Sequence, residues 1–91
     1  MVYAERIRDK LTAAFAPKAL EVLDESHRHS GHAGARPEGE THFTVTMVSD
    51  SFAGQSRVQR QRAVYQVLDA ELKERVHALA LNLATPEEVQ Q

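Results

Sequence analysis

Apolar residues near the start of the chain repeat at helical spacing. The positions between them are mostly charged, which is the pattern of an amphipathic helix with one buried face. The apolar face carries Tyr3, Ile7, Leu11, Ala14 and Phe15. Because Pro17 cannot continue a helix and restricts the residue before it, we predict a helix over residues 3–16.

Two later segments show the alternation typical of β-strands. Residues 41–49 are the clearer strand, because β-branched residues are abundant and Phe43, Val45 and Met47 alternate with polar side chains. Residues 19–25 form a shorter predicted strand. The fifteen residues between them, 26–40, hold three of the four glycines, which predicts a loop long enough to be functional.

A turn at Asp50, Ser51 and Gly54 leads to a helix that begins after Ser56, a good N-cap, and extends to about residue 75. The expected apolar face of this helix carries Val58, Val64, Tyr65, Leu68 and Leu72.

The end of the chain predicts a third strand and the start of a last helix. Over residues 76–84, three leucines share one parity and therefore one face of a strand. The segment 85–88 has threonine as N-cap, proline at the first helical position and glutamate at the third.

The order of these elements predicts an α+β fold in one domain over residues 1–91. The first two strands can pair antiparallel across the loop, and the third, after a helical crossover, can lie parallel to one of them. Helices then cover one face of a small three-stranded mixed sheet.

Composition narrows the function. The 91 residues include no cysteine, which excludes disulfide scaffolds, thiolate nucleophiles and self-sufficient cysteine-ligated clusters. The net charge of −2 indicates that the chain as a whole is not built to coat nucleic acid or an anionic membrane, so such binding would need a local basic patch. No apolar run is long enough to cross a membrane, and the N-terminus lacks a signal peptide, so we expect a cytoplasmic protein without a membrane partner. Because phosphate loops and nucleophile elbows are also missing, we expect no enzyme.

Histidines are the unusual feature of the loop. His27, His29 and His32 lie within six residues, at spacings that can place imidazoles around one ion. A closed zinc site would need His42 or His77 as well. The alternative is a solvated polar loop, and His42 by its position is expected to lie on a strand face.

Basic residues gather at the start of the long helix. Arg57, Arg60 and Arg62 lie in its first two turns, where they oppose the helix macrodipole. This arrangement favours either a binding surface or a solvated arginine face.

Five blocks, in order and spacing, resemble the signature of the BolA family and cover nearly the whole chain. They are Asp24-Glu25-Ser26, Glu40-Thr41-His42-Phe43, Phe52-Ala53-Gly54-Gln55-Ser56, Arg60-Gln61-Arg62 followed by Tyr65, and Val76-His77-Ala78-Leu79. The resemblance implies an α-β-β-α-α-β-α order similar to a class II KH domain. The predicted long helix would then split in two, and we place the break near Arg62–Ala63.

The resemblance also implies a role in iron–sulfur cluster or iron homeostasis. Members of the family pair with a monothiol glutaredoxin and share a [2Fe-2S] cluster, with thiolates from the glutaredoxin and from glutathione. The ligands from this chain would be His77 and a loop histidine, because the alternative loop ligand, cysteine, is missing. His32 is favoured, His29 is next and His27 is third. Alone, the chain is expected to bind no cluster tightly and to be a monomer or weak homodimer.

The family is also linked to DNA binding and transcription regulation in stress response and cell morphology. The expected phosphate contacts here are Arg57, Arg60 and Arg62. The family commonly has histidine between the last two arginines, whereas this chain has Gln61.

Overall fold

The computed structural model describes residues 2–25, 42–74 and 76–89. In chain order the elements are α1 (Val2–Phe15), β1 (Ala19–Asp24), β2 (His42–Val48), the 3-10 helix η2 (Asp50–Phe52), α2 (Arg57–Val67), α3 (Asp69–Glu74), β3 (Ala78–Ala84) and α4 (Pro86–Val89). This is the predicted α-β-β-α-α-β-α order, with one short additional turn of helix.

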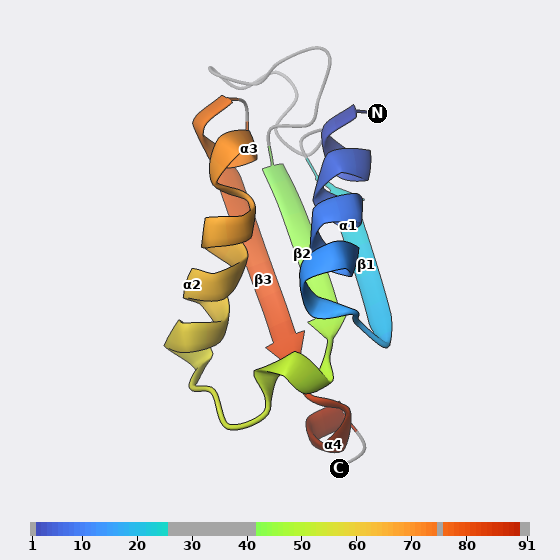
Figure 1. The fold of residues 1–91 in the computed structure, drawn as a ribbon. Helices are drawn as coiled ribbons and strands as arrows, with labels where there is room; N and C mark the ends of the chain where they lie inside the picture. The colour runs from blue at the N-terminus through green and yellow to red at the C-terminus, as the bar shows by residue number, and fades with distance from the viewer. Residues whose placement is uncertain (1, 26–41, 75, 90–91) are drawn as a thin grey trace.

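The three strands form one mixed sheet in the order β1-β2-β3. Strand β1 is antiparallel to β2, with Ala19 opposite Val48, and β3 is parallel to β2, with His42 opposite Ala78. Helices α1, α2 and α3 lie on one face of this sheet, with α1 over β1 and β2 and the α2–α3 pair over β3 (Figure 1). The predicted α+β fold is therefore confirmed.

The core lies between the central strand and the helices. Strand β2 buries Phe43, Val45 and Met47, as its alternation predicts. Helix α1 buries Ile7, Leu11 and Phe15 against them, whereas Ala14, predicted on the same face, is exposed. The short helix η2, predicted only as a turn, buries Phe52 beside the Phe15 ring at a centroid distance of 5.3 Å.

The predicted apolar face of α2 is wrong at two positions. Val58 is 54% exposed and Tyr65 is 41% exposed, whereas Val64 and Leu68 are buried. At 3.6 residues per turn Val58 lies about 120° around the helix from Val64. The row that faces the sheet is therefore Val64, Leu68 and Leu72, at i, i+4 and i+8.

The break in the long helix was predicted near Arg62–Ala63, and this is also wrong: the chain departs from helical geometry at Leu68. No proline or glycine interrupts the hydrogen bonds at Arg62. At Leu68 the ψ angle is 18°, and its N–H is shared between the carbonyls of Val64 and Gln66. Because the Leu68 side chain stays buried, the helix changes direction there without leaving the core.

The end of α1 and the starts of α2 and α4 follow local sequence closely. Ala16 has a φ angle of 43° directly before Pro17, which ends α1 one residue earlier than predicted. Both predicted N-caps are present. Ser56 and Gln59 form a capping box at the start of α2. At the start of α4, the Glu88 carboxylate accepts from the backbone N–H of Thr85, and the Thr85 hydroxyl accepts from the backbone N–H of Glu88. The third strand begins at Ala78 rather than at residue 76.

Candidate functional site

Three chain segments converge at one end of the sheet. His77 directly precedes β3, whose first residue, Ala78, lies opposite His42 at the start of β2. The N–H of Glu25 donates to the His42 carbonyl at 2.8 Å, so the two residues that flank segment 26–41 are tied together at this same end. The predicted ligands His27, His29 and His32 belong to that segment and lie outside the described residues.

His77 is exposed on a backbone that is fixed on both sides. Val76, the residue before it, is 3% exposed and donates its N–H to the Glu71 carbonyl at 3.0 Å. Ala78, the residue after it, is paired in the sheet. The chain therefore presents one imidazole to the solvent from a defined position.

The other described histidine, His42, is less exposed than His77. His42 is half-buried and shares a face of β2 with Thr44 and Thr46, as expected for a strand-face residue. Within residues 2–25, 42–74 and 76–89, no three histidines, cysteines or acidic residues lie together as a metal site would need. His77 therefore belongs to no metal-binding cluster formed by the described residues alone.

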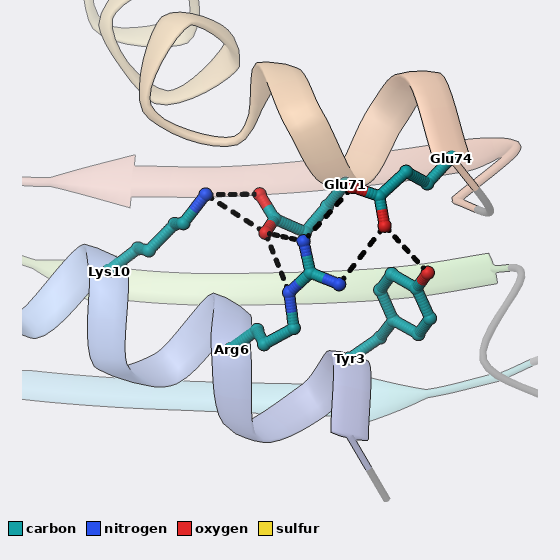
Figure 2. Close-up of polar contacts among 5 residues, drawn as sticks. All are labelled: Tyr3, Arg6, Lys10, Glu71 and Glu74. Atoms are coloured by element: carbon teal, nitrogen blue, oxygen red, sulfur yellow. Dashed lines mark hydrogen bonds and ion pairs between the residues drawn. The ribbon is translucent and has the colours of Figure 1, made fainter.

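Five polar residues join α1 to α3 beside this site (Figure 2). They are Tyr3, Arg6 and Lys10 of α1 with Glu71 and Glu74 of α3. We call them the α1–α3 network. The side chain of Glu71 has no solvent exposure and accepts hydrogen bonds from Arg6 Nε at 2.9 Å and Lys10 Nζ at 3.0 Å. Glu74 accepts from Arg6 Nη1 at 3.1 Å and from the Tyr3 hydroxyl at 2.9 Å.

Both carboxylates of the network are held in the charged form. Burial opposes ionisation of Glu71, but hydrogen bonds from Lys10, from its own backbone and from Arg6 outweigh burial and leave the pKa of Glu71 below its ordinary value. Hydrogen bonds from Arg6 and then Tyr3 lower the pKa of Glu74 as well.

Sequence patterns do not reveal this network, because Arg6 and Lys10 alternate with apolar residues in the manner of a solvated face. One signal was present. Glu71 is seven residues after Val64 and three after Leu68, so it lies on the buried row of the helix pair. A carboxylate at such a position needs cationic partners.

The three candidate DNA-contacting arginines differ in environment. Arg57 and Arg62 are exposed on α2. Arg60, by contrast, has a side chain only 11% exposed, and it donates to Glu88 of α4 at 2.7 and 3.0 Å. Its Nε also donates to the Gln55 carbonyl at 3.1 Å. Arg57 and Arg60 line a cleft of about 530 Å³ between α2, β3 and α4.

In the described part of the chain, no helix combines the length and apolar character needed to span a membrane.

Comparison with protein families gives one match that covers most of the chain. The model of the BolA-like proteins matches residues 11–88. The chain is 49% identical over 88 residues to the DNA-binding transcriptional regulator BolA of Escherichia coli (strain K12), covering 97% of this chain and 80% of that protein. It is 48% identical over 88 residues to SufE-like protein 1, chloroplastic/mitochondrial, of Arabidopsis thaliana, covering 92% of this chain and only 24% of that longer protein.

Solved structures agree with the sequence relatives. The BolA domain of SufE1 from Arabidopsis thaliana has a TM-score of 0.87 at 44% identity, covering 97% of this chain and 96% of that one. The solution structure of BolA1 from Mus musculus has a TM-score of 0.82 at 39% identity, covering 99% of this chain and 70% of that one. By fold, by motif order and by relatives aligned along nearly its whole length, the chain belongs to the BolA-like protein family.

Proposed function

We propose that this protein is an iron–sulfur cluster or iron homeostasis adaptor. It forms a heterodimer with a monothiol glutaredoxin and supplies histidine ligands to a bridging [2Fe-2S] cluster, while the glutaredoxin and glutathione supply thiolates. The observation that carries the proposal is the exposed His77, held at the end of the sheet where both residues that flank segment 26–41 also lie.

The donor set fits a shared cluster better than a closed site. The chain has no cysteine, so any thiolate must come from elsewhere. The exposed imidazole of His77 remains accessible to a second protein, and neutral imidazole is a good ligand for iron. When bound, a histidine-ligated cluster has a higher reduction potential than one held by cysteine alone.

Reconstitution with a purified monothiol glutaredoxin, glutathione, iron and sulfide tests the proposal. The visible circular dichroism of the mixture reports a cluster shared between the two proteins. We expect His77→Ala to abolish the signal of the heterodimer, and His42→Ala, the matched control at the same end of the sheet, to retain it. Retention of the full signal by a folded His77→Ala variant would contradict the assignment.

The second ligand is tested in the same assay. His32→Ala, His29→Ala and His27→Ala are compared one at a time, and we expect His32→Ala to have the largest effect. If all three single variants keep the full signal, the second ligand does not come from segment 26–41.

A second function, DNA-binding transcription regulation, is favoured by two observations. Arg57 and Arg62 are exposed together on α2. The Escherichia coli relative carries the name of a DNA-binding transcriptional regulator. Phosphate contacts by these arginines would make binding salt-dependent. Fluorescence anisotropy with duplex DNA over a series of salt concentrations tests this function, and undetectable or salt-independent binding would exclude it.

A further inference from the structure

Helix α3 is too short to hold its own position. It has six residues, and isolated helices of that length are marginal in water. Its placement therefore depends on its contacts with the rest of the protein. The α1–α3 network provides two such contacts, one through Glu71 and one a turn later through Glu74.

The contact at Glu71 is the stronger constraint. Its carboxylate is fully buried and lies 2.7 Å from Arg6 Nη2 and 2.9 Å from Lys10 Nζ. Charged hydrogen bonds in a buried site are stronger than those in water and fix geometry more tightly. Figure 2 shows Arg6 and Lys10 of α1 both pointing at this one carboxylate.

The same residue is connected to the candidate ligand through its backbone. The Glu71 carbonyl accepts the N–H of Val76, the residue directly before His77. Beyond His77, Ala78 is already paired with His42. His77 is thus a single residue between two fixed points, and one of these points depends on where Glu71 is held.

We propose that the α1–α3 network is a positioning device for His77, which sets the place and orientation of its imidazole through Glu71 and Val76. The inference rests on the proposed function, since it assigns a purpose to the placement of the cluster ligand. Arg6, Lys10 and Glu71 are positioning residues, since each acts on His77 through other groups rather than as a ligand.

The test compares Glu71→Gln with two controls. Val64→Ala removes buried apolar volume from α2 outside the network and therefore controls for a general loss of stability. Lys73→Ala breaks the exposed Asp69–Lys73 ion pair on α3 itself. In the isolated protein, amide hydrogen exchange at Val76, whose N–H donates to the Glu71 carbonyl, and the NMR shifts of the His77 imidazole are measured. In the heterodimer, the lifetime of the cluster is followed by visible circular dichroism.

We expect Glu71→Gln alone to speed amide exchange at Val76, shift the His77 imidazole resonances and shorten the cluster lifetime about tenfold, a size typical of outer-shell changes at metal sites. Equal effects of Val64→Ala would overturn the inference, because a merely structural role predicts them. If Glu71→Gln does not fold, Arg6→Gln replaces it, since Arg6 is 33% exposed and easier to substitute.

The outcomes separate this inference from the proposed function. If His77→Ala retains the cluster signal, the proposed function is wrong. If His77→Ala loses the signal but folded Glu71→Gln behaves like Lys73→Ala in every measurement, the function stands and the positioning role is wrong.

Discussion

Arg60 and Glu88 form a two-point ion pair that ties α4 to the start of α2. The guanidinium nitrogens lie 2.7 and 3.0 Å from the two carboxylate oxygens. The remaining contacts of Arg60 are also internal, since it donates to the Gln55 carbonyl and lies over the Phe52 ring at 5.8 Å. The Arg60 side chain therefore stabilises the fold, whereas the exposed Arg62 side chain is available to a binding partner.

Arg60→Ala is expected to destabilise the protein more than Arg62→Ala does. The first change leaves Glu88 without its cation and uncovers the Phe52 ring. The second removes an exposed side chain, and such changes usually stay within about 0.5 kcal/mol. Urea unfolding followed by far-UV circular dichroism measures the difference. Equal midpoints for the two variants would show that the ion pair contributes no stability.

DNA affinity should depend on the exposed arginines. We expect Arg57→Ala and Arg62→Ala each to reduce the slope of log K against log salt by about one, because each removes one phosphate contact. Glu88→Gln serves as a control that removes the negative charge paired with Arg60 without changing the arginine count. An unchanged salt slope in both arginine variants would place the DNA contact, if one exists, on another surface.

Stability should fall in acid, and Glu88 should account for part of the loss. The Glu88 carboxylate accepts hydrogen bonds from the Arg60 side chain and, with a smaller effect, from the Thr85 backbone N–H, and these lower the pKa of Glu88 to about 2. A carboxyl whose pKa is lower in the folded state stabilises the protein above its unfolded pKa of about 4.3 and loses that contribution as pH falls toward 2. Urea midpoints measured from pH 5 to pH 2 should therefore decline less steeply for Glu88→Gln. A parallel decline in both proteins would contradict the predicted linkage.

Ser49 joins α1 to the end of β2 from a fully buried position. Its hydroxyl donates to the Phe15 carbonyl at 2.7 Å and accepts from the Ser51 N–H at 3.1 Å. Ser49→Ala removes both bonds and should cost about 1–3 kcal/mol of unfolding free energy. Ser51→Ala is the comparison, because Ser51 is exposed and its weaker bond to the same carbonyl is 3.2 Å long. A smaller effect at position 49 than at position 51 would contradict this account.

Much of the architecture is local in origin and was predictable. The alternation at Phe43, Val45 and Met47 determined the central strand and its buried face. The caps at Ser56 and Thr85 depend on hydrogen bonds within one turn, so the residue types alone indicated where α2 and α4 begin. The motif blocks likewise indicated the family and singled out His77.

The remaining features depend on residues far apart in the chain. No proline or glycine near Arg62 or Leu68 marks where the long helix is interrupted, so local sequence did not indicate the position of the break. Likewise, Arg6 and Glu71 are 65 positions apart, and Arg60 and Glu88 are 28 apart. The sequence by itself determined the strands, the starts of α2 and α4 and the candidate ligand. Only the tertiary structure decided which charges are buried and paired. Ion pairing requires that two side chains lie close together in space, whereas sequence periodicity indicates only which face of its own helix or strand a residue occupies.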